Sequence, residues 1–86
     1  MSAEQTQDRI AALRAQIDAA DAAIAEAVAH RRSLSERVQE LRRVAGGPAR
    51  EASREDAVVS SYAERLGHGG AEVGRAVLDA CLPPRS

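Results

Sequence analysis

The stretch that decides the fold is residues 5–44, QTQDRIAALRAQIDAADAAIAEAVAHRRSLSERVQELRRV, which contains neither glycine nor proline. Its apolar side chains recur at alternating spacings of three and four: Ile10, Leu13, Ile17, Ala20, Ile24, Ala27, Leu34, Val38 and Leu41. This spacing predicts one long helix that packs along another helix. Ser2 and Gln5 are spaced as a capping box, which favours a helix start there. Forty helical residues would form a rod of about 60 Å.

Two shorter helices are predicted in the rest of the chain. Gly46-Gly47-Pro48 ends the first helix, and a second is expected over residues 51–66, before the glycines at 67–70. A third is expected over residues 71–82, and Pro83-Pro84 ends it. No stretch alternates with the period of a strand, so the prediction for residues 1–86 is a single all-α domain of three helices.

The lengths of these helices predict a homodimer. The second and third helices together span about 42 Å and cannot cover a stripe of about 60 Å. The core is also thin for one chain, because Tyr62 is the sole aromatic residue among 86. We therefore expect an intertwined dimer in which the first helices of two chains pack together. The alternative, a simple coiled-coil stalk, is disfavoured because a stalk would not need two further helices.

Composition excludes several classes of function. Twelve basic residues, all arginine, oppose thirteen acids, and without a basic run the chain is not expected to bind nucleic acid. Cys81 is the sole cysteine, so no internal disulfide can form. No apolar stretch approaches a membrane span, and the N-terminus is polar, which points to a cytoplasmic protein.

Arg31 interrupts the apolar stripe of the long helix. Ile10, Ile17 and Ile24 recur every seven residues on the face expected to pack on another helix (the seam), and Arg31 is the next residue of this series. A charge there is costly unless an anion lies beside it. Arg42 lies eleven residues further on, which returns to within about 20° of the same face and about 16 Å along the axis. Arginine binds carboxylates through a planar two-pronged donor. The pair therefore predicts a site for a small dianion.

Arg14 lies seventeen residues before Arg31, about 25 Å along the same helix. It cannot share the site within one chain, but the partner's Arg14 could reach it in an antiparallel dimer. For a single arginine, a solvated helix face is the simpler interpretation, and we assign it to Arg32, Arg37 and Arg43.

Two blocks of this sequence resemble the all-helical class of chorismate mutases. The first is Leu13-Arg14-x-x-Ile17-Asp18-x-x-Asp21-x-x-Ile24 with Arg31-Arg32-x-Leu34, and the second is Pro48-x-Arg50-Glu51-x-x-Arg54-Glu55. The segment from Val73 to Cys81 is similar to the third helix of that family. The resemblance runs from about residue 9 to 82. It implies an enzyme that rearranges chorismate to prephenate without a metal or cofactor.

The resemblance also implies roles for individual residues. Arg31 and the partner's Arg14 would bind the two carboxylates of chorismate, and Arg42 would face the ether oxygen of the bond that breaks. Glu51 and Glu55 would lie near the ring hydroxyl. The further residues that would line the substrate site are Arg54, Cys81 and Arg85.

Some positions depart from the family pattern. Glu51 replaces the commoner Asp, and Cys81, a weak hydrogen-bonding group, stands where a Ser is frequent. Arg85 falls where some members place a Gln on the ether oxygen, but it follows two prolines. The short link between the second and third helices resembles an actinobacterial subgroup. Its members are activated by docking on DAHP synthase, which is therefore a possible partner.

Two other functions stay open. Related helical enzymes act on 4-amino-4-deoxychorismate or isochorismate, and the acids Glu51 and Glu55 could favour an ammonium over a hydroxyl. The ordinary hydroxyl substrate is held by similar acids and is preferred. A non-catalytic helical dimer or regulatory partner is disfavoured, because a decayed site would have lost at least one of its charged residues. All of them are present: Arg14, Arg31, Arg42, Arg54 and Glu55.

Overall fold

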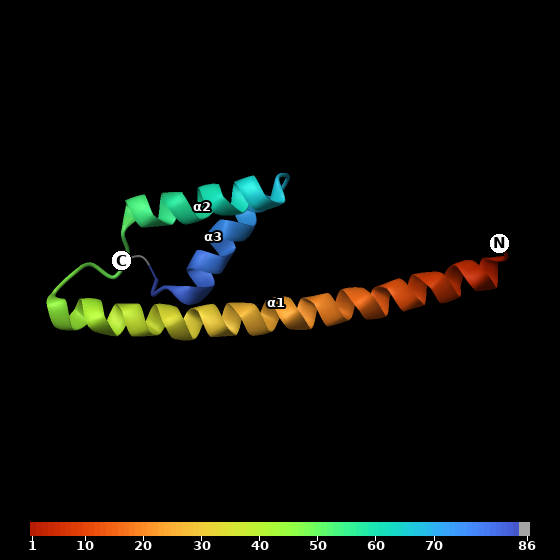
Figure 1. Ribbon diagram of the computed structural model, residues 1–86, viewed down its shortest axis with the longest axis horizontal. Helices are drawn as coiled ribbons and strands as arrows, with labels where there is room; N and C mark the ends of the chain where they lie inside the picture. Colours follow the sequence, from red (N-terminus) through yellow and green to blue (C-terminus); the bar gives the residue numbers. More distant parts are fainter. Residues whose placement is uncertain (85–86) are drawn as a thin grey trace.

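The computed structural model describes residues 1–84 and contains three helices: α1 (Ala3–Ala45), α2 (Ala52–Leu66) and α3 (Gly70–Cys81) (Figure 1). No strand occurs within that range, so the predicted all-α fold is confirmed. Each helix begins and ends within two residues of its predicted bounds. None of the three helices is long and apolar enough to cross a membrane over the residues described.

Short-range hydrogen bonds fix both ends of α1. The Ser2 hydroxyl accepts from the Gln5 backbone N–H at 3.1 Å, and the Gln5 side-chain oxygen accepts from the Ser2 N–H at 3.0 Å. This is the predicted capping box, which is therefore confirmed. At the other end Gly46 adopts a left-handed φ of 79°, and the Gly47 N–H donates to the Arg42 carbonyl at 2.8 Å. Glycine suits this position because it has no Cβ to clash.

α3 lies between the other two helices and holds them apart. It packs on both α1 and α2, whereas α1 and α2 make no close backbone approach over the described chain (Figure 1). Two buried glycines, Gly70 and Gly74, bring α3 close to α2. A Cβ on Gly74 would lie 3.1 Å from the Tyr62 Cβ and 3.2 Å from the Val59 Cα. Beyond this crossing, the C-terminal half of α1 and the start of α2 line a common pocket.

The N-terminal half of α1 has no cover from its own chain. No residue of α1 is buried, and the seam side chains Leu13, Ile17 and Ile24 are 57%, 57% and 60% exposed. Figure 1 shows this half, in red and orange, extending away from α2 and α3. The buried core is small and lies at the other end: Val58, Leu78 and Cys81. The uncovered stripe matches the one predicted to pack on a second chain, and the homodimer itself stays a prediction.

Light scattering on the purified protein should therefore give about twice the 9.1 kDa chain mass at micromolar concentration. Ile17→Glu should weaken the dimer strongly, because each buried isoleucine contributes about 1.5–3 kcal/mol and the glutamate would bury a charge. Gln16→Glu, one position away on the same exposed turn, is the matched control and should keep the dimer. A monomer mass for the wild type would contradict the dimer.

Candidate active site

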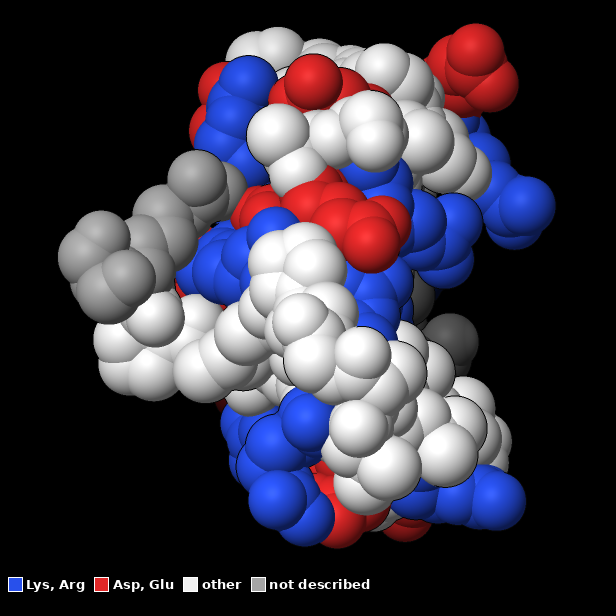
Figure 2. All heavy atoms as spheres, turned by 90° about the vertical axis from the view of Figure 1, so that its left-hand side faces the viewer, with Lys and Arg blue, Asp and Glu red and all other residues white. Residues whose placement is uncertain are grey.

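A pocket of about 270 Å³ lies where α1 faces the start of α2. The apolar part of its wall consists of Leu34, Val38, Ala49, Val58, Leu78 and Leu82. The polar part consists of Arg31, Ser35, Gln39, Arg42, Arg50, Glu51, Arg54 and Glu55. Figure 2 views the end of the molecule where α1 ends and α2 begins, and shows acidic and basic side chains side by side there.

The charges around this pocket favour an anionic ligand. Four arginines and two glutamates of residues 1–84 line it, an excess of two positive charges. A small dianion would neutralise that excess. The volume of the pocket is also suitable for a small molecule, and it is slightly below that of a typical drug-sized site.

Arg31 and Arg42 both line the pocket, and both side chains are half-buried. The prediction that they share one face of the first helix is therefore confirmed. Arg31 forms no ion pair or hydrogen bond with another residue of the described range, so its guanidinium donors are available to a ligand. The same holds for Arg54, which lines the pocket from the first turn of α2.

Arg42 is held in place at the end of α1. Its Nη1 lies 3.3 Å from Glu51 Oε1 and donates to the Pro48 carbonyl at 3.2 Å. Glu51 is the residue immediately before α2, with an extended backbone. The two side chains are 26% and 45% exposed, so the ion pair contributes little to stability. It does orient the guanidinium of Arg42 along the pocket wall.

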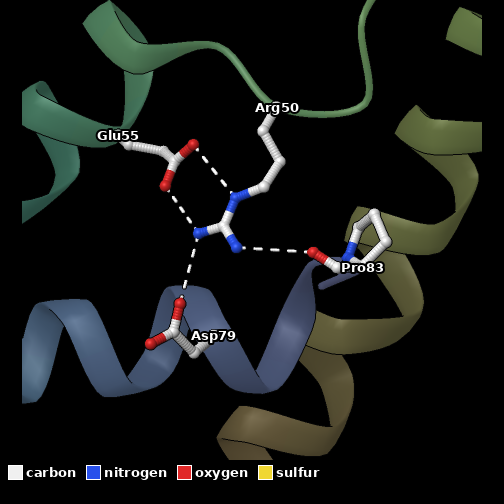
Figure 3. Close-up of polar contacts among 4 residues, drawn as sticks. All are labelled: Arg50, Glu55, Asp79 and Pro83. Atoms are coloured by element: carbon white, nitrogen blue, oxygen red, sulfur yellow. Dashed lines mark hydrogen bonds and ion pairs between the residues drawn. The ribbon is translucent and has the colours of Figure 1, made fainter. Parts of the chain in front are cut away.

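Glu55 is the buried carboxylate of the site. It is 6% exposed and receives two hydrogen bonds from Arg50: from Nε at 3.1 Å and from Nη2 at 2.6 Å (Figure 3). Arg50 also donates to Asp79 and to the Pro83 carbonyl. The hydrogen bonds to Glu55 raise the pKa of Arg50 further above its ordinary value, against the opposing effect of its burial. Arg50 is therefore a permanent cation.

Two of the predicted site residues within residues 1–84 are not brought to this pocket. Arg14 is exposed on the uncovered half of α1, about 25 Å from Arg31 along the helix, as the assignment to a partner's site requires. Cys81 is buried, but it lines a second hollow with Arg32, Arg43 and Pro83, which shares Gln39 and Leu82 with the pocket. Leu78 of α3 and Leu82, the residue after α3, line the pocket instead. Arg85 lies outside the described residues.

Sequence reasoning missed the part played by Arg50. The residue stands inside the motif Pro48-x-Arg50-Glu51, but the motif alone does not show that the side chain points inward. A signal was nevertheless present, because Glu55 follows five residues later and a buried acid requires a cation. The pocket residues Ser35 and Gln39 were also missed; they lie four and eight residues after Arg31 and thus on the same helix face.

The comparisons with known proteins agree with this geometry. The family model of chorismate mutase type II matches residues 13–80. The chain belongs to this family. Its predicted function as a chorismate mutase, an isomerase, is confirmed at that level.

No group of His, Cys, Asp and Glu side chains in residues 1–84 is arranged to hold a metal ion.

A solved structure shares the fold. It is the non-covalent complex of DAHP synthase and chorismate mutase from Corynebacterium glutamicum with a bound transition state analogue. A chain of this complex aligns with a TM-score of 0.89 and 23% identity, over 95% of this chain and 99% of that one. Such a likeness establishes the three-helix fold across almost the whole chain. The comparison with curated proteins returns no significant match.

Proposed function

We propose that the protein converts chorismate to prephenate in a site built from the pocket of one chain and Arg14 of the partner subunit. The observation that carries this proposal is the excess of two positive charges in a small pocket of a chorismate mutase type II chain. Chorismate is a small dianion, so its two carboxylates match that excess. The rearrangement breaks one carbon–oxygen bond and forms one carbon–carbon bond within a single molecule, and no proton or group leaves.

Such a reaction needs positioning and electrostatic stabilisation, because it has no nucleophile to activate. Arg31 and the partner's Arg14 would bind the two carboxylates and hold the folded conformer, in which the reacting carbons are close. Arg42 would donate to the ether oxygen, where negative charge grows as the bond breaks. The ion pair with Glu51 supports this role, because it holds the guanidinium in place before substrate arrives.

The ion pairs of the two glutamates favour chorismate, which carries a ring hydroxyl, over its amino analogue. Glu51 already pairs with Arg42, and Glu55 already pairs with Arg50. An ammonium group on the ring would need uncompensated negative charge, which paired carboxylates do not supply. A hydroxyl is neutral and needs no such charge from the two carboxylates.

DAHP synthase is the proposed partner protein, because the similar solved structure is a complex of a chorismate mutase with that enzyme. The short link between α2 and α3 also resembles that of the actinobacterial subgroup whose members dock on DAHP synthase. Both enzymes would belong to one biosynthetic pathway, which makes the cytoplasm the proposed location.

The test is a steady-state assay on the purified protein with chorismate, 4-amino-4-deoxychorismate and isochorismate, each with and without DAHP synthase. Chorismate absorbance should fall, prephenate should appear as the product, and kcat/KM should be highest for chorismate. Addition of DAHP synthase should raise the rate. A higher kcat/KM on the amino substrate would change the substrate assignment. No turnover of chorismate in either condition would refute the proposed function.

A further inference from the structure

Ser35 lies between Arg31 and Arg42 on the face of α1 that lines the pocket. It follows Arg31 by four residues, which places it about 6 Å further along the helix and about 40° around it. It precedes Arg42 by seven residues, or about 10 Å along the helix and about 20° around it. A ligand that bridges the two arginines would therefore pass over the Ser35 side chain.

The hydroxyl of Ser35 is available to such a ligand. The residue is half-buried, and its side chain forms no hydrogen bond with another residue of the described range. A helical serine can bond back to the carbonyl one turn earlier, but this one does not. Within residues 1–84, no buried side-chain nitrogen or oxygen lacks a partner, so the Ser35 oxygen is not sealed inside the protein. It therefore remains accessible in the pocket wall.

The fold gains little from a hydroxyl at this position. The neighbouring residues of α1 in the pocket wall, Leu34 and Val38, are apolar. A half-buried hydroxyl in such surroundings is unfavourable unless it is hydrogen-bonded. Alanine would also form the helix better than serine. The hydroxyl is thus better explained by a bound ligand than by the stability of α1.

We propose that Ser35 is a further substrate-binding residue, whose hydroxyl donates a hydrogen bond to the chorismate carboxylate that Arg31 binds. This inference rests on the proposed function. A carboxylate has about four lone-pair sites, and a two-pronged arginine occupies two of them, which leaves room for a neutral donor. Ser35 lies nearer to Arg31 than to Arg42 along the helix, which favours the carboxylate over the ether oxygen as its acceptor.

Ser35→Ala removes this donor and tests the proposal. Its KM for chorismate should rise about tenfold, because the lost hydrogen bond has an ionised acceptor. Its kcat should change less than twofold, because the contact is made in ground and transition states alike, and Arg31 and Arg42 remain in place. The rearrangement keeps both carboxylates, so calorimetric titration with prephenate should show a similar loss of affinity.

Thermal unfolding of the unliganded protein separates this role from a structural one. The Tm of Ser35→Ala should equal or exceed that of the wild type, because alanine favours the helix and no hydrogen bond within the protein is lost. Ser35→Cys keeps nearly the size of the side chain but offers only a weak donor. Its KM should rise as in Ser35→Ala, which separates the loss of the hydrogen bond from the small gain in pocket volume.

Ser33→Ala is the matched control, since it makes the same substitution two residues away on α1. Ser33 is exposed and does not line the pocket. It lies about 200° around the helix from Arg31, on the opposite face. Its KM and kcat should stay within about twofold of the wild type.

Each result has one interpretation. With an active wild type, a raised KM at unchanged kcat and undiminished Tm in Ser35→Ala supports the proposal. An unchanged KM in Ser35→Ala or in Ser35→Cys overturns this proposal alone, as does an equal rise of KM in Ser33→Ala. A fall in kcat at unchanged KM also overturns it, because the hydroxyl would then act on the ether oxygen. A wild type without chorismate turnover overturns the proposed function and this inference with it.

Discussion

Arg31→Ala should lower kcat/KM for chorismate by at least about a hundredfold and leave the helical circular dichroism unchanged. The side chain lines the pocket and forms no ion pair within residues 1–84, so the fold does not depend on its charge. Its proposed role is to bind a substrate carboxylate in ground and transition states, and its loss should therefore damage both KM and kcat. Removing a half-buried unpaired cation should keep or raise the stability of the unliganded protein.

Arg37→Ala is the matched control for this variant. Arg37 is exposed on the same helix and does not line the pocket. Its loss should leave kcat/KM within about twofold of the wild type, as for other surface substitutions. If Arg31→Ala kept near-wild-type activity, the assignment of Arg31 to the substrate carboxylate would be wrong.

Arg42→Ala should act differently, by lowering kcat more than it raises KM. A group that meets the ether oxygen acts where charge develops in the transition state, and loss of one such preorganised donor costs about 3 kcal/mol, or about a hundredfold. Arg42→Lys keeps a point charge and should preserve much of the rate. The measurement is a steady-state comparison of the wild type with both variants on chorismate.

Arg43→Ala controls for loss of an arginine at the end of α1. Arg43 is the next residue, and its side chain is 71% exposed. Its Nη2 lies 2.6 Å from Glu40 Oε1, and neither residue lines the pocket. Its removal should leave kcat and KM nearly unchanged. If Arg42→Ala kept the wild-type kcat and only bound chorismate more weakly, Arg42 would bind a substrate carboxylate or be a surface residue. Arg85 would then be the next donor to test.

The fold was predictable because its signals are local and agree with one another. The apolar spacing of residues 5–44 has one solution, a long helix, and the glycines and prolines that follow it mark each later boundary. Ser2 and Gln5 act across a single turn, so the capping box was visible in the sequence. The crossing of α3 between α1 and α2 was not predictable. It depends on contacts of Gly70 and Gly74 with α2, which no local pattern reveals.

The site was predictable where its residues share one helix. Arg31 and Arg42 are related by helical geometry alone, and both line the pocket. The pairing of Arg50 with Asp79 joins residues 29 positions apart, and only the packing of α3 brings them together. Cys81 failed to reach the pocket for a similar reason, because the rotation of α3 about its own axis follows from tertiary packing. Resemblance to a family supplies residue types but not this rotation.

A subunit-mixing experiment tests most directly the central claim, that each chorismate site is completed by the partner's Arg14. Homodimers of Arg14→Ala and of Arg31→Ala should each be nearly inactive. A mixed dimer has one site with both arginines intact, so unfolding and refolding the two variants together in equal amounts should restore about a quarter of wild-type activity. The readout is the fall in chorismate absorbance. Recovery to about that level would support the shared site. A mixture no more active than the separate variants, although mixed dimers have formed, would contradict it.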